Sequence, residues 1–135
     1  MELTGLAPLI QVYDMTEAVR FYHDVLGFEL VDHSPEIDAP EGRYFHWCWL
    51  RHGPVELMLN TAYDAGERPS GRDPARETGH GDILLYIGCK DVDAAHDLLR
   101  SRGVDCKPPS VAPYGMKQLV VKDLDGYLLC FQAPT

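Results

Sequence analysis

The stretch that decides the fold is PLIQVYDMTEAVRFYHDVLGF, residues 8–28, which returns in outline as LLYIGCKDVDAAHDLLRSRGV at residues 84–104. Each copy begins with an apolar strand, continues through an aspartate, and ends in an apolar-periodic helix followed by glycine. Asp14 corresponds to Asp91, and Val12 to Cys89, at the same offset. A repeat of this length predicts a chain built from two similar modules.

Both copies carry the signals of a short amphipathic helix. Asp14 precedes Glu17 by the spacing of a capping box, with Asp in place of Ser or Thr. Gly27 and Gly103 follow the two helices as expected C-terminal residues. The predicted apolar faces consist of Ala18, Phe21, Tyr22 and Val25 in the first helix and of Ala94, Ala95, Leu98 and Leu99 in the second.

Three strand-like segments follow each helix. They read FELVDH, YFHWCWL and VELMLN in the first copy, and VDCKP, MKQLVVK and YLLCF in the second. The links RHGP (51–54) and DLDG (123–126) predict tight hairpins. The order β-α-β-β-β therefore occurs twice, in an α+β fold. We expect a single domain over 1–135, with module 1 at about 4–62, a linker at about 63–80 and module 2 at about 81–133. The polar linker, structureless by its composition, is interpreted as a flap or an interface arm.

This order resembles the vicinal oxygen chelate superfamily, which contains glyoxalase I, extradiol dioxygenases, fosfomycin-resistance enzymes and the bleomycin-resistance binding proteins. The matching pieces are VYDMTEAVRFYHDVLGFEL, GPVELMLN, KDVDAAHDLLRSRGV and YGMKQLVVKDLDGYLLCF, which together cover nearly the whole chain. The resemblance implies two βαβββ modules that form a curled mixed sheet, a cup, with the helices packed outside. It also implies a homodimer, which composition by itself does not show.

The hairpins assign side chains to the faces of the strands. A loop at 51–54 pairs Trp49 with Glu56, and a loop at 123–126 pairs Leu119 with Cys130, although a three-residue loop or a bulge would break this count. With the resemblance choosing which face lines the cup, the expected lining is Leu9, Gln11, Trp47, Trp49, Glu56, Met58, Leu84, Tyr86, Leu119 and Cys130.

The metal-binding members take one ligand from the first and one from the last strand of each module. The resemblance carries these positions onto Ala7, Glu56, Leu84 and Cys130. Two of these have no donor atom and one has a thiol in place of a carboxylate, so we expect no metal and no cofactor. Cys130 is interpreted as a small apolar filler. His80 is expected in a loop and His96 on the surface of a helix.

Both tryptophans, Trp47 and Trp49, fall on the face of Glu56. They are suited to stacking on a flat or cationic ligand, and burial in a core or a dimer interface stays open. Glu56 has three open roles, as a ligand anchor, a structural group, or an acid/base and so the one candidate for catalysis. The predicted ligand-binding residues are Leu9, Gln11, Trp47, Trp49, Glu56, Met58, Tyr86, Tyr114 and Cys130.

The favoured hypothesis is a metal-independent small-molecule-binding protein of the glyoxalase/bleomycin-resistance type, holding a small hydrophobic, aromatic or cationic molecule. The alternatives are a metal-dependent lyase, isomerase or dioxygenase of that superfamily, and a metal-free enzyme that uses Glu56. A net charge of -9 argues against a nucleic-acid partner. No apolar run approaches the roughly 20 residues that cross a bilayer, and the four cysteines contain no CxxC. We therefore expect a cytoplasmic chain with reduced thiols.

Overall fold

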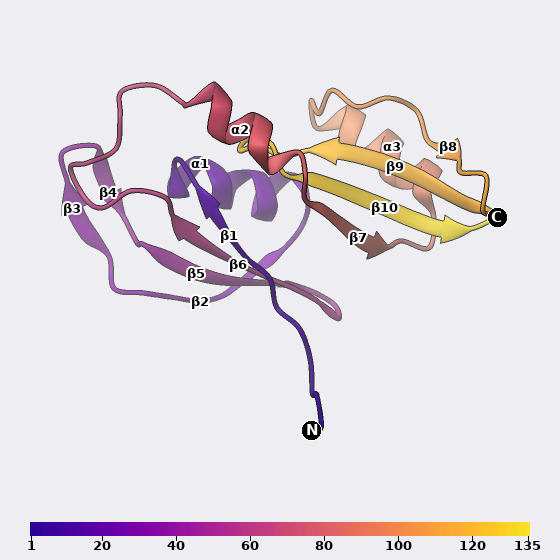
Figure 1. The fold of residues 1–135 in the computed structure, drawn as a ribbon, viewed down its shortest axis with the longest axis horizontal. Coiled ribbons are helices and arrows are strands. Elements are labelled where there is room, and N and C mark those ends of the chain that lie inside the picture. The colour runs from indigo at the N-terminus through magenta and orange to yellow at the C-terminus, as the bar shows by residue number, and fades with distance from the viewer. The chain divides into compact units, whose positions relative to one another are not determined.

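The computed structural model describes all of residues 1–135, which form two compact units, Met1–Arg72 (unit 1) and Asp73–Thr135 (unit 2). Each unit contains one copy of the repeat, and Figure 1 shows the strands of each sheet side by side. Unit 1 consists of β1 (Leu9–Val12), α1 (Met15–Arg20), the π-helical turn η1 (Phe21–Val25), β2 (Glu29–His33), β3 (Ile37–Ala39), β4 (Gly42–Tyr44), β5 (Trp47–His52) and β6 (Val55–Thr61). Unit 2 consists of α2 (Pro74–His80), β7 (Leu84–Gly88), α3 (Val92–Ser101), β8 (Ser110–Val111), β9 (Met116–Lys122) and β10 (Leu128–Pro134). The predicted α+β class with two βαβββ-like modules is confirmed.

The main sheet of unit 1 has the strand order β1-β6-β5-β2, with β1 parallel to β6. Asp14 caps α1 as predicted, since its carboxylate accepts a hydrogen bond from the Glu17 backbone N–H at 3.0 Å. One face of the sheet packs under this helix, where the Cys48 sulfur lies 3.9 Å from that of Met15. The buried residues of this core are Ile10, Val12, Met15, Ala18, Phe21, Tyr22, Phe28, Cys48, Leu50, Leu57 and Leu59.

The hairpin between β5 and β6 is tighter than predicted. His52 pairs with Val55, so the loop is Gly53 and Pro54 alone, and Gly53 has the positive φ of 55° that a two-residue hairpin favours at its first position. Trp49 is therefore opposite Met58 and not Glu56. Because the register error is two residues, every side chain keeps its predicted face.

Unit 2 has the strand order β7-β10-β9-β8, and α3 covers one face. Asp91 caps this helix through the Ala94 N–H at 2.9 Å. The buried stripe of α3 differs from the predicted one: Val92 and Leu99 are buried, whereas Ala94 and Leu98 are exposed. His96, expected on the surface, completes the stripe with its side chain only 18% exposed. Its Nε2 atom is buried without a hydrogen-bond partner.

The register of the DLDG hairpin also differs from the predicted one. Lys122 pairs with Leu128, which leaves five residues, 123–127, in the turn. The Asp123 carboxylate organises this turn by accepting from the N–H groups of Asp125 and Tyr127, both at 2.9 Å. The register moves by one residue, so Leu119 pairs with Phe131 and points beneath α3, where it is buried. The prediction that Leu119 shares a face with Cys130 was wrong.

The segment between the repeats is not structureless. Its second half forms α2, which packs on the DLDG turn of unit 2: the His80 ring stacks on Tyr127 at 4.0 Å, and its Nδ1 bonds the Asp125 carbonyl at 2.6 Å. His80 is thus the last residue of a helix, and the expectation of a loop was wrong. A Cβ on Gly126 would lie 2.3 Å from the Glu77 carbonyl oxygen, so only glycine permits this approach.

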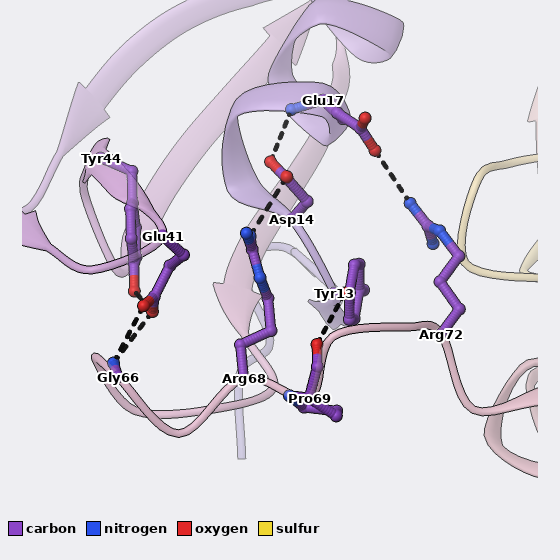
Figure 2. Close-up of polar contacts among 9 residues, drawn as sticks. All are labelled: Tyr13, Asp14, Glu17, Glu41, Tyr44, Gly66, Arg68, Pro69 and Arg72. Carbon is purple, nitrogen blue, oxygen red and sulfur yellow. Dashed lines mark hydrogen bonds and ion pairs between the residues drawn. The ribbon is translucent and has the colours of Figure 1, made fainter.

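Residues 62–72, which we call the strap, are fastened to unit 1 (Figure 2). The Tyr13 hydroxyl donates to the Pro69 carbonyl at 2.7 Å, while the guanidinium groups of Arg68 and Arg72 lie 5.1 and 4.9 Å from the Tyr13 ring centroid. The Glu41 carboxylate accepts from the Gly66 N–H at 3.0 and 3.1 Å. These contacts make the strap a part of unit 1 and not a free flap.

Candidate functional site

The face of the unit 1 sheet opposite α1 carries no helix of that unit, and we call it the open face of unit 1. The register of β1, β6 and β5 arranges its side chains in rows across the strands. One row joins Leu9, Met58 and Trp49, and the next joins Gln11, Asn60 and Trp47. Leu9 is 47% exposed and both indoles are half-buried, so the face offers apolar and aromatic surface that the core of unit 1 does not use.

The third row of this face is charged. Glu56 lies opposite Arg51, which in turn lies opposite Glu29 on β2. The nearest charge contact of Arg51 is with Glu29, at 4.0 Å, and its guanidinium carbon lies 5.6 Å from the Trp49 ring centroid. Arg51 therefore interacts only weakly with Glu29 and Trp49, because exposed pairs of this kind contribute up to about 1 kcal/mol to stability. Glu56 has neither a hydrogen-bond nor an ion-pair partner, which leaves its carboxylate available to a cation on the edge of the aromatic rows.

The open face of unit 2, opposite α3, is organised in the same way. Tyr86 lies level with Cys130 and Val120, and the next row joins Gln132 with Gln118. Tyr86 is 55% exposed and Tyr114, in the loop before β9, is 67% exposed. Cys130 lies between its neighbours with 1% exposure, and burial raises the pKa of its thiol. A buried thiol with a raised pKa is a poor nucleophile at neutral pH.

The family's metal positions do not fit a metal ion in this chain. If the β1–β6 register is continued two residues, Ala7 lies level with Glu56, which pairs a carboxylate with a methyl group. In unit 2, Leu84 lies level with Leu128, and Cys130 lies one layer further along β10. One carboxylate and one buried thiol are the donors at these four positions, fewer than the three or four that such sites use. Neither unit contains a cluster of three or more His, Cys, Asp or Glu side chains arranged to hold a metal.

A charged hollow of about 390 Å³ lies beside the strap of unit 1. Its lining consists of Asp14, Thr16, Glu17, Arg20, Glu41, Gly42, Arg43, Tyr44 and Arg68. Several of these charges already have partners, since Arg68 pairs with Asp14 at 3.1 Å and Glu17 pairs with Arg72 at 3.2 Å (Figure 2). Burial and the Glu41 carboxylate raise the pKa of Tyr44 to about 12. We interpret this hollow as the place where the strap is held against unit 1.

Sequence reasoning missed three residues of the open faces. Arg51 was placed in a hairpin loop, because RHGP was read as four turn residues when only Gly53 and Pro54 turn. Gln118 was missed because the DLDG register put odd-numbered β9 residues on the wrong face, and Gln132 because the last strand was predicted to end at Phe131, one residue before it. The Asx-type bonds of Asp123 were the signal that could have corrected this error, since they favour a longer turn.

Comparison with known proteins agrees with this architecture. TnmS3, an antibiotic binding protein from Streptomyces sp. CB03234, superimposes with a TM-score of 0.70 at 24% identity, over 100% of this chain and 99% of that chain. A bleomycin resistance determinant encoded on the transposon Tn5 has a TM-score of 0.70 at 18% identity, over 98% of each chain. A superfamily member from Sphaerobacter thermophilus DSM 20745 has a TM-score of 0.63 at 25% identity, over 97% of each chain. The identities to TnmS3 and to the Tn5 determinant are below 25%, so these two similarities show the fold and nothing about function.

No curated protein sequence matches the chain. None of its helices is long and apolar enough to cross a membrane. The model of the family described as Glyoxalase/Bleomycin resistance protein/Dioxygenase superfamily matches residues 6–131, nearly the whole sequence. The chain therefore belongs to the Glyoxalase/Bleomycin resistance protein/Dioxygenase superfamily.

Proposed function

We propose that this protein binds a small aromatic or cationic molecule, without a metal ion, on the open face of unit 1. The observation that carries the proposal is that both tryptophans of the chain lie on a helix-free sheet face next to Glu56, a carboxylate without a partner. Indole faces attract flat rings and cations, and a carboxylate beside them selects a protonated amine. Leu9, Met58 and Gln11 complete the surface.

The open face of unit 2 is proposed as a ligand surface in the same way, with Tyr86 and Tyr114 exposed around the buried Cys130. The antibiotic-binding and bleomycin-resistance proteins among the similar structures support a sequestering role over a catalytic one. The donor set at Ala7, Glu56, Leu84 and Cys130 supports binding without a metal. Four unpaired cysteines suit a reducing compartment, so we propose the cytoplasm as the location. We also propose that the protein forms a homodimer.

Titration with proflavine, a planar cation, and with bleomycin tests the proposal through tryptophan fluorescence and calorimetry. Trp47→Leu and Trp49→Leu should each weaken proflavine binding about tenfold or more, in line with the stacking contribution of one indole. Glu56→Gln should weaken proflavine but leave acridone, a neutral ring system of similar shape, unchanged. The absence of saturable binding by any planar probe would contradict the proposal.

Two further measurements address the metal and the assembly. Elemental analysis of the purified protein should find no stoichiometric Ni, Zn, Mn or Fe. A stoichiometric metal that is lost together with Glu56 would favour the metal-dependent alternative. Light scattering should give twice the 15.1 kDa of one chain, and a monomer at all concentrations would overturn the dimer.

A further inference from the structure

A chain of hydrogen bonds crosses the open face of unit 2. Gln118 Nε2 donates to the Tyr114 hydroxyl oxygen at 2.9 Å and to Gln132 Oε1 at 2.9 Å. The nearby Tyr114 phenol is the largest cause that raises the pKa of Tyr86, so the two phenols lie close together on this face. Both bonds of Gln118 come from one amide nitrogen, which has two protons to donate.

The direction of these bonds decides what the network can offer a ligand. Tyr114 accepts from Gln118, so its own O–H is left to donate outward. Accepting a hydrogen bond polarises a hydroxyl and makes it a stronger donor. Gln132 receives at its carbonyl oxygen and keeps its amide N–H₂ free. The network therefore presents donors, from Tyr114 and Gln132, at one place.

The loop that carries Tyr114 is held in position. The Gly115 N–H bonds the Ala112 carbonyl at 3.0 Å, and the Ala112 N–H bonds the Met116 carbonyl at 2.8 Å. Thr135, beyond the end of β10, bonds the Gly115 carbonyl through its N–H and its hydroxyl, both at 3.0 Å. A phenol on such a closed turn is preorganised, so a ligand that bonds it does not have to order a mobile loop.

The chemistry of the ligand group follows from the charges. No cation belongs to the network, and the chain carries a net charge of -9, so a carboxylate or a phosphate is disfavoured here. Beside the donors, Val120 and Leu84 are 46% and 41% exposed and provide apolar surface. Donors at the edge of an apolar surface match an uncharged acceptor oxygen on a hydrophobic skeleton.

We propose that Tyr114, polarised by Gln118, and the amide of Gln132 bind a neutral carbonyl oxygen of the small molecule. This subsite rests on the proposed function and narrows its ligand to aromatic or hydrophobic ketones, quinones or amides. Gln118 is a positioning residue, because it acts through Tyr114 and Gln132.

Xanthone and xanthene test the subsite, because they share a tricyclic skeleton and xanthene lacks the carbonyl. The wild-type protein should bind xanthone about fivefold more tightly than xanthene, the value of one hydrogen bond. Xanthone should also shift the side-chain amide NMR signals of Gln118 and Gln132. Tyr114→Phe should weaken the preference, because only the Gln132 amide then remains as a donor, and should leave xanthene affinity unchanged. Gln118→Glu should do the same, because a carboxylate accepts the Tyr114 proton and turns it inward.

The control is Tyr44→Phe, which removes a phenol that bonds Glu41 in unit 1 and should leave the preference intact. Equal wild-type affinities for the two tricycles would overturn the subsite while leaving the proposed function standing. Tighter binding of xanthene-9-carboxylate than of xanthone would overturn the assignment to a neutral oxygen. If neither tricycle binds but proflavine does, the subsite alone fails; if no probe binds, the proposed function fails with it.

Discussion

Arg68 reaches back from the strap to place its guanidinium 3.1 Å from the carboxylate of Asp14, the residue that caps α1. Both side chains are about four-fifths buried, so this ion pair is better shielded from water than an exposed one. The same guanidinium lies over the ring of Tyr13. The start of the helix and the strap therefore stabilise each other.

Removing either partner should destabilise the protein. Arg68→Ala should lower the free energy of unfolding by about 1–2 kcal/mol, and Asp14→Ala by about 2 kcal/mol, because Asp14 also loses its cap. Urea denaturation of both variants and of the double mutant measures their coupling. Arg43→Ala is the control, since the Arg43 side chain is 59% exposed in its ion pairs and its loss should leave the free energy of unfolding nearly unchanged. Additive effects of Arg68 and Asp14 would contradict the coupling.

Gly126→Ala should be strongly destabilising. Gly126 has a φ of 87°, and the new Cβ would meet the Glu77 backbone at 2.3 Å. Strain and clash together should cost more than about 2 kcal/mol. Gly53→Ala is the matched control, because its φ is 55° and nothing lies within 4 Å of the added atom; it should cost about 1 kcal/mol. Equal losses for the two variants in thermal unfolding would show that α2 does not press on the turn.

His96→Leu should stabilise unit 2. The variant removes a buried ring nitrogen without a partner and keeps a similar volume on the inner stripe of α3. The expected gain is about 1 kcal/mol. His23→Leu, on the exposed side of η1, should change stability little. A loss of stability in His96→Leu would mean that the imidazole has a partner in solution.

The four cysteines should react in two classes. Cys48 and Cys130 are buried, and burial raises the pKa of Cys48 to about 11. Cys89 and Cys106 are partly exposed. An aromatic disulfide reagent at pH 8 should label Cys89 and Cys106 first, and Cys48 and Cys130 only as the chain unfolds. Mass spectrometry of the labelled peptides distinguishes the classes, and early labelling of Cys130 would contradict its burial.

Deprotonation of Tyr44 should destabilise the folded protein at alkaline pH. Its folded pKa of about 12 lies above the unfolded value of about 10. Its contribution is therefore complete below pH 10 and is lost as the pH rises towards 12. Glu41 acts in the opposite sense: its bond from Tyr44 lowers its pKa, so its contribution is present above the unfolded pKa and is lost on acidification. Unfolding curves of wild type and Tyr44→Phe should converge as the pH approaches 12, and a constant difference would argue against the Tyr44–Glu41 bond.

The sequence predicts this fold well where periodicity and capping act locally. Asp14 and Asp91 cap their helices, and alternation places Trp47 and Trp49 on the face away from Cys48. Turn lengths were predicted less well, because DLDG can close in more than one register and the side chain of Asp123 selects the longer turn. An error of two residues at Gly53 preserved the faces, whereas an error of one at Asp123 exchanged them for β9.

Other features depend on contacts between residues that are distant in the chain. The stacking of His80 on Tyr127 and the burial of His96 follow from packing of α2 and α3, which the local pattern of their own helices does not encode. The polar network of Tyr114, Gln118 and Gln132 likewise depends on β9, the loop before it and β10 meeting in one register. The residue types alone do not predict this network, because only the strand register brings these side chains together.

The strap also decides where this protein can be divided. A fragment cut after β6, near residue 62, would keep every strand of unit 1 but lose the bonds that Asp14, Glu17, Glu41 and the Tyr13 hydroxyl make to the strap. A fragment ending at Arg72 would retain all of these bonds. The smallest piece of the first repeat that retains its bonds to the strap therefore extends eleven residues past its last strand, to the residue before the Asp73 cap of α2.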